Sequence, residues 1–263
     1  MASRSSKKEA ARAQRLAEEQ AKAERERRQR RMQMLAGVVV AAVAVVVVAI
    51  VLSTGGGSAK ALKHGTQASQ TTTAVEQLLS GIPQSGARLG NPKAPVTITY
   101  FGDLECPACA QFTLAGGFAQ LVANDVRRGK VQVLYHSLET ATTDPATFQT
   151  QQTAALAAGQ QRRFWDYAEL FYHEQGTESS GYVNESYLDG LAGQIPGLNL
   201  NRWSSARKDP ALSSQLQVDM QAALGAGAHG TPTLIAQGPK GKSQVPGGIP
   251  SYSQLELAIK SVA

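Results

Sequence analysis

Cysteine and histidine are scarce in this chain of 263 residues, which has two cysteines, Cys106 and Cys109, and four histidines. A zinc site uses four ligands, and the chain offers neither a second cysteine pair nor histidines at ligand spacing, which disfavours a metal site. A purely structural disulfide between Cys106 and Cys109 would close a very small loop and add little stability. At this spacing the two sulfurs can bond or stay apart as thiol and thiolate, so a redox pair is the favoured interpretation.

The part of the chain after residue 33 has a net charge of zero. Residues 1–33 carry eleven Lys and Arg against five Glu, whereas the rest of the chain carries fifteen residues of each sign. The basic character of the whole chain therefore belongs to a basic tail at residues 1–33. It is no argument for a nucleic-acid-binding domain, and we expect no nucleic acid partner.

Residues 34–52 form a run of nineteen residues without a charged side chain, mostly Val and Ala. At about 1.5 Å rise per residue, a helix of this length nearly spans a bilayer core of about 30 Å. We predict a transmembrane helix here, with the basic tail in the cytoplasm and everything after Leu52 outside. A cleavable signal peptide is the alternative, because Ala59-Lys60-Ala61 fits a cleavage pattern, but the basic region before the run is longer than usual.

Residues 53–80 are rich in Ser, Thr, Gly, Gln and Ala, a composition that predicts a flexible linker whose end, Val75–Leu79, is a short helical or extended lead-in. We place the start of the folded domain at residue 81. The sequon Asn184-Glu185-Ser186 lies within this domain, and its use depends on the host.

The two cysteines lie between a predicted strand and a predicted helix. Residues 95–101 alternate β-branched and apolar side chains, as a buried strand does, and Pro107 suits the first turn of a helix. Cys106 then falls at the N-cap, where free N–H groups and the helix dipole stabilise a thiolate and lower the thiol pKa below about 8.5. We assign Cys106 as the attacking sulfur and Cys109 as the resolving one.

The rest of the domain reads as an α/β fold. Residues 131–138 predict a second strand, parallel to the first because a helix connects them. Residues 145–227 show helical spacing and no convincing strand, which predicts a helical insertion. A strand at 231–237, a short return strand at 243–245 and a helix at 252–262 complete the domain.

This order of elements resembles the thioredoxin fold with the inserted helical domain of DsbA. The motifs Asp103-Leu104-Glu105-Cys106-Pro107 and Gly230-Thr231-Pro232-Thr233 are similar to those of the DsbA-like, membrane-anchored branch of bacterial thioredoxin-fold proteins. The resemblance covers residues 81–263. It implies that the Thr231-Pro232 peptide is cis and lies beside the cysteines, where the backbone of Thr231 can pair with an extended substrate.

Two departures from the family pattern concern the thiols. The spacer Pro107-Ala108 lacks the His that follows Pro in the strongest oxidants, and Tyr100 stands six residues before Cys106, where the family places a buried acid. The nearest acids are Asp103 and Glu105, and His229 lies close to the Thr231-Pro232 loop. These three residues are the candidates for tuning the sulfurs.

We therefore expect an extracytoplasmic thiol–disulfide oxidoreductase that needs no cofactor and acts as a dithiol oxidase. The resemblance implies exported, cysteine-containing polypeptides as substrates and a quinone-linked membrane oxidase, similar to DsbB or to vitamin K epoxide reductase, as the reoxidant; membrane lipid would surround the anchor. A reductase or isomerase is the alternative enzyme. A non-catalytic thioredoxin-fold binding or chaperone module is the alternative outside catalysis.

Overall fold

The computed structural model describes residues 62, 63 and 65–263. The predicted basic tail at 1–33 and transmembrane helix at 34–52 lie outside this range. Within it, no helix combines the length and the apolar character needed to cross a bilayer.

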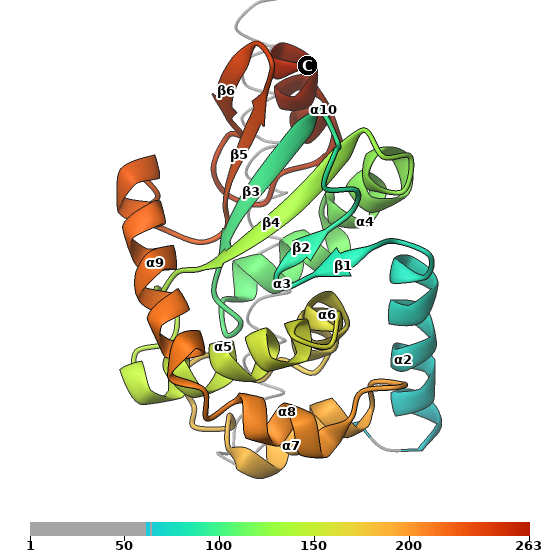
Figure 1. Ribbon diagram of the computed structural model, residues 1–263, viewed down its shortest axis with the longest axis vertical. Coiled ribbons are helices and arrows are strands. Elements are labelled where there is room, and N and C mark those ends of the chain that lie inside the picture. The colour runs from blue at the N-terminus through green and yellow to red at the C-terminus, as the bar shows by residue number, and fades with distance from the viewer. Residues whose placement is uncertain (1–61, 64) are drawn as a thin grey trace, which may run out of the picture. The chain divides into compact units, whose positions relative to one another are not determined.

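A six-stranded mixed sheet in the order β1-β2-β4-β3-β5-β6 forms the centre of the domain (Figure 1). The central strands β3 and β4 are parallel, and all other neighbouring pairs are antiparallel. The strands are β1 (Gln84–Ser85), β2 (Arg88–Leu89), β3 (Val96–Gly102), β4 (Val131–Ser137), β5 (Thr233–Gly238) and β6 (Gly241–Gln244).

Helices pack against the sheet and against one another. They are α2 (Thr66–Leu79), α3 (Pro107–Ala115), α4 (Phe118–Leu121), the π-helix η1 (Val122–Val126), α5 (Pro145–Gly159), α6 (Phe164–His173), α7 (Glu185–Gly193), α8 (Leu200–Ala206), α9 (Pro210–Ala226) and α10 (Tyr252–Val262). In Figure 1 the helices α5 to α8 lie below the sheet, and α9 runs along its side.

The predicted strands and the helical insertion are confirmed. The insertion consists of α5 to α9, all between β4 and β5. Most of its helices begin at a side-chain cap that accepts a backbone N–H, as Asp144 does for α5, Asn184 for α7 and Asp209 for α9. These caps satisfy donors that a helix start leaves free, and so they fix where each helix begins.

The flexible linker predicted for residues 53–80 was wrong for residues 66–74, and the helical lead-in considered for Val75–Leu79 is the end of a longer helix, Thr66–Leu79. These residues form α2, which packs on α6 and buries Val75 and Leu79 in the main core. The polar composition of the segment hid the buried positions Thr71, Val75 and Leu79, which are four residues apart and so share one helix face. The folded unit therefore begins before residue 81.

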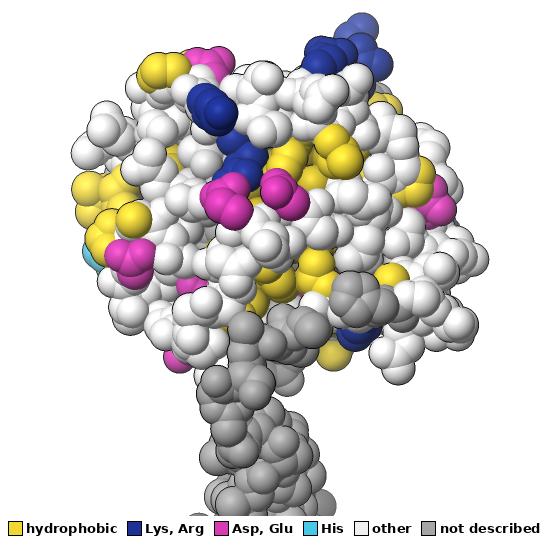
Figure 2. Space-filling model, turned by 90° about the horizontal axis from the view of Figure 1, so that it is seen from below, with side chains coloured by type: hydrophobic (Ala, Val, Ile, Leu, Met, Phe, Trp, Pro, Cys, Tyr) yellow, Lys and Arg dark blue, Asp and Glu magenta, His cyan; other side chains and the backbone are white. Residues whose placement is uncertain are grey.

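Charge on the surface is mixed. On the described part of the face shown in Figure 2, acidic and basic side chains are interspersed among uncharged ones. This arrangement agrees with the balanced charge of the chain after residue 33. It gives no local support for a polyanionic partner on that face.

Candidate active site

Three loops meet at one end of the central strands. Because β3 and β4 are parallel, with Gly102 opposite Ser137, the segments that follow both strands start side by side. Strand β5 is antiparallel to β3, with Thr233 opposite Phe101, so the segment that precedes β5 starts from the same end. The topology thus brings the cysteine motif, the loop at residues 138–142 and the Thr231-Pro232 peptide together.

Cys106 is the N-cap residue of α3, as the sequence predicted. Its Sγ accepts a hydrogen bond from the backbone N–H of Cys109 at 3.4 Å, and the backbone N–H of Ala108 also stabilises the thiolate. Pro107 occupies the first helical position and is exposed, whereas Cys106 is only 5% exposed. The sulfur therefore lies just below the surface, at an end of a helix that favours an anion.

The pKa of Cys106 is lowered to about 6. The main cause is a hydrogen bond from the Cys109 thiol, and the Thr231 side chain and the backbone amides add to it, while burial opposes the shift. A thiol with this pKa is largely ionised at pH 7, and the thiolate is the reactive form.

The Thr231-Pro232 peptide is cis, which confirms the expectation from the family resemblance. The Sγ of Cys106 lies 3.4 Å from the Thr231 carbonyl oxygen. The hydroxyl of Thr231 lies 2.5 Å from the hydroxyl of Thr140, in the loop after β4. This second contact holds the threonine that faces the reactive sulfur.

Cys109 is completely buried, and this burial raises the pKa of its thiol. Hydrogen bonds from the Asp103 backbone and from the Tyr100 side chain partly oppose that rise. Both cysteines are free thiols in this structure. The pair is therefore asymmetric, with an ionised sulfur just below the surface at Cys106 and a neutral, completely enclosed one at Cys109.

The side chain of Asp103 holds the loops together and does not contact either sulfur through a described hydrogen bond. One carboxylate oxygen accepts the backbone N–H groups of Thr140, Ala141 and Thr142, at 2.9 to 3.1 Å. The other accepts the Thr142 hydroxyl and the backbone N–H of Glu105. Asp103 thus joins the loop after β3 to the loop after β4, and only its backbone acts on Cys109.

Glu105 and His229, the other two predicted tuning residues, are also not joined to the sulfurs by hydrogen bonds among the described residues. Glu105 is buried and accepts the backbone N–H of Ser179, and burial raises the pKa of its carboxyl. His229 is exposed. The donors that reach Cys106 are therefore neutral groups.

Sequence reasoning missed three residues of the site, namely Thr140, Tyr172 and Gln175. Gln175, just after α6, donates its side-chain amide to the carbonyl oxygens of Leu104 and Cys106, at 2.7 and 3.1 Å. All three come from segments distant in sequence from the cysteines. No local motif marks them, so only the tertiary structure could find them.

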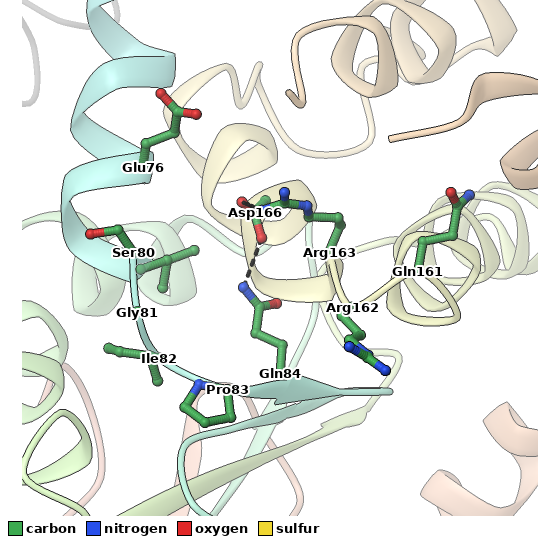
Figure 3. Close-up of a pocket in the computed structure, with 11 residues that line it drawn as sticks. Glu76, Ser80, Gly81, Ile82, Pro83, Gln84, Gln161, Arg162, Arg163 and Asp166 are labelled. Atoms are coloured by element: carbon green, nitrogen blue, oxygen red, sulfur yellow. Dashed lines mark hydrogen bonds and ion pairs between the residues drawn. The ribbon is translucent and has the colours of Figure 1, made fainter. Parts of the chain in front are cut away.

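A cavity of about 460 Å³ lies elsewhere, between α2, β1 and α6 (Figure 3). In it the side-chain amide of Gln84 donates to the carboxylate of Asp166 at 2.7 Å, and Arg163 pairs with the same carboxylate. Neither cysteine lines this cavity. Gln84, Arg163 and Asp166 already satisfy one another there, and no thiol lies in the lining, so we do not assign the exchange chemistry to this cavity.

Comparison with known proteins agrees with this geometry. A family model described as "Thioredoxin" matches residues 84–255. The crystal structure of oxidised BdbD from Bacillus subtilis superposes with a TM-score of 0.58 at 20% identity, covering 69% of this chain and 96% of that one. The structure of DsbA from Chlamydia trachomatis gives a TM-score of 0.56 at 19% identity, covering 66% and 89%. The expected DsbA-like fold is confirmed.

Two curated relatives align with only part of this chain and with less than two thirds of their own length. Disulfide bond formation protein D of Bacillus subtilis (strain 168) is 24% identical over 156 residues, which are 56% of this chain and 65% of the relative. The Na⁺/H⁺ antiporter NhaA of Herminiimonas arsenicoxydans is 28% identical over 151 residues, which are 57% of this chain. This chain spans only 22% of that antiporter's length. The family model, in contrast, covers well over half of the chain, and the chain therefore belongs to the thioredoxin family.

Proposed function

We propose that this protein is an extracytoplasmic thiol–disulfide oxidoreductase that introduces disulfide bonds into exported polypeptides. The observation that carries the proposal is the environment of Cys106, an N-cap sulfur with a lowered pKa that faces the cis Thr231-Pro232 peptide. A merely structural cysteine pair needs neither an ionised sulfur nor an adjacent backbone on which a peptide can align.

Exchange would start from the oxidised pair. A substrate thiolate attacks Cys106 Sγ and forms the mixed disulfide, the Cys106–Cys109 bond breaks, and the electron pair stays on Cys109, which takes up a proton. A second substrate thiolate then attacks the substrate sulfur of the mixed disulfide, and Cys106 leaves as a thiolate. The substrate loses two electrons and gains a disulfide, and the cysteine pair gains those two electrons.

The stabilised Cys106 thiolate favours the oxidase direction. A contact that stabilises the reduced form makes the corresponding disulfide a stronger oxidant, because release of the thiolate is then favourable. The amides at the start of α3, the Thr231 side chain and the Cys109 thiol all act in this sense. Together they supply stabilisation that the spacer Pro107-Ala108 does not provide from its own side chains.

We further propose that residues 34–52 anchor the domain, with residues 1–33 on the cytoplasmic side. The support is the apolar composition of 34–52 and the excess of basic residues before it. An anchor would keep the domain in the same plane as a quinone-linked membrane oxidase that takes up its two electrons, which raises their effective concentration. Exported cysteine-containing chains would be the substrates.

The redox equilibrium with glutathione tests the direction of exchange. We expect a potential above about −200 mV for the Cys106/Cys109 couple, and two-electron oxidation of a dithiol peptide by the oxidised protein. Cys106→Ser abolishes that oxidation. A potential near −270 mV would support a reductant instead, and a Cys106 pKa as high as that of a free thiol would support a binding module.

Labelling of intact cells tests the location. In a variant without Cys106 and Cys109, a cysteine placed at the exposed position Lys242 should react with a membrane-impermeant maleimide. A cysteine at Ser5 should react only after the cells are opened. The reverse pattern, or equal labelling of both, would contradict the proposed orientation.

A further inference from the structure

Three buried tyrosines belong to the same core cluster as Cys109, interact with it electrostatically, and have no part in the exchange reaction as described. Tyr100 comes from β3, Tyr135 from β4 and Tyr172 from α6, and each is at most 2% exposed. The hydroxyl oxygens of Tyr100 and Tyr172 are 3.4 Å apart. A buried hydroxyl is costly unless it has a partner, so a pair of them beside a reactive thiol calls for a role.

Tyr100 connects this pair to the thiols. Burial raises the pKa of the Cys109 thiol, and hydrogen bonding to the Tyr100 side chain opposes that rise; hydrogen bonding to the Cys109 side chain is in turn the main cause of the lowered pKa of Cys106. The ring of Tyr100 is held by edge-to-face contacts with Phe112 and Tyr135, with centroids 5.4 and 5.2 Å apart. The ring is thus held in place, with its hydroxyl 3.4 Å from that of Tyr172.

Either hydroxyl of the Tyr100–Tyr172 pair can be the donor, because both are protonated. Burial raises the pKa of both Tyr100 and Tyr172 well above the ordinary phenol value, so both remain protonated donors at any working pH. Each group has one proton to donate. Tyr172 can donate to Tyr100, Tyr100 to Cys109, and the Cys109 thiol to the Cys106 thiolate.

We propose that Tyr100 and Tyr172 are positioning residues whose hydroxyls form a chain of donors that directs the Cys109 S–H toward the Cys106 thiolate. Hydrogen bonds in such a chain polarise one another, which strengthens the last of them. The chain replaces a charged partner, since the donors that reach Cys106 in the described residues are all neutral. This inference rests on the proposed function, because it concerns the same thiol pair.

Substitution of each tyrosine by Phe tests the chain, since Phe keeps the ring and removes only the hydroxyl. The reduced full-length protein is alkylated with iodoacetamide between pH 4 and pH 9, and the modified cysteine is identified by mass spectrometry. With the loss of one neutral hydrogen bond, we expect Tyr100→Phe to slow alkylation of Cys106 at pH 5 about fivefold. Tyr172→Phe, one bond further away, should slow it about twofold.

Tyr167→Phe is the matched control. Tyr167 lies in α6 like Tyr172, is fully buried, and donates its hydroxyl to the Leu188 carbonyl oxygen at 3.2 Å, outside the chain of donors. Tyr167→Phe should lose stability much as the other two variants do, but its alkylation of Cys106 should keep the pH profile of the wild type. A merely structural role for Tyr100 and Tyr172 would give all three variants that profile.

The outcomes separate this inference from the proposed function. If wild-type alkylation has its midpoint near pH 6 and both Tyr100→Phe and Tyr172→Phe superpose on it, the donor chain is overturned and the function stands. If the wild-type midpoint is that of a free thiol, the proposed function fails as well. If Tyr100→Phe does not fold, the alkylation profile of Tyr172→Phe is compared with that of Tyr167→Phe. Slower alkylation at pH 5 in Tyr172→Phe alone supports the donor chain, and equal profiles overturn it.

Discussion

The carboxylate of Asp103 lies between two loops and accepts hydrogen bonds from both. Three of its donors are consecutive backbone N–H groups at residues 140–142, which carry Thr140 toward Thr231. Because these groups are partly or wholly buried, water cannot easily replace the carboxylate. Asp103, predicted from the sequence to tune the sulfurs, thus shapes the loop that faces Cys106.

Replacement of Asp103 by Ala should therefore act on stability. Several buried donors would lose their acceptor, each at about 1–3 kcal/mol, so we expect the free energy of unfolding to fall by about 3 kcal/mol or more. Urea unfolding of the reduced protein measures this. Glu178→Ala, at an exposed position, is the comparison and should change it little. A loss below about 1 kcal/mol for Asp103→Ala would show that the carboxylate does not hold the loops.

At this scale the sequence could identify the cysteines and the Thr-Pro peptide, because their motifs are local. It could also flag Tyr100 as unusual for its position. It could not supply Tyr172 or Thr140, because each reaches the site from another element through a single hydroxyl. The residues that neighbour a Thr or Tyr in the sequence say little about which distant group its hydroxyl will contact.

Helix α2 carries the largest difference between the expected and the observed elements. It joins the core through a narrow stripe, with Leu79 only 3% exposed, while its other faces are polar. We expect Leu79→Ala to lower the free energy of unfolding by about 3 kcal/mol, the usual cost of a buried leucine. Gln77→Ala, in the same helix but exposed, should have little effect. Equal, small effects in urea unfolding would mean that α2 is dispensable.

Elements with regular spacing or clear boundaries were predicted well. Strands β3 and β4, helices α5 and α6, and the closing helix α10 all have apolar patterns several residues long. The hairpin of β1 and β2 was missed because each strand has two residues, too few to show any alternation. Helix α8 was not distinguished within the predicted helical insertion, since Trp203 is its only buried side chain.

For the whole molecule, the Cys106 pKa links stability to pH. The folded value, about 6, lies below the unfolded value of about 8.5, so the unfolded reduced chain binds more protons between these values. The thiolate contribution is therefore fully present above about pH 8.5 and is lost as the pH falls through about 6. Between these limits it should change by about 1.4 kcal/mol per pH unit at most.

Reduced wild type and Cys106→Ser, unfolded in urea at pH 5, 7 and 9, measure this contribution as a difference in which the titrations that do not depend on Cys106 cancel. We expect the advantage of the wild type to be smallest at pH 5 and largest at pH 9. A difference that stays constant over this range would mean that folding does not stabilise the thiolate. The free energy that stabilises the Cys106 thiolate also enters the redox equilibrium. When the protein transfers its disulfide to a substrate, the product is the reduced protein with this thiolate, so stabilising the thiolate favours the transfer. Stability of the reduced molecule at neutral pH and oxidising power would then have one physical origin.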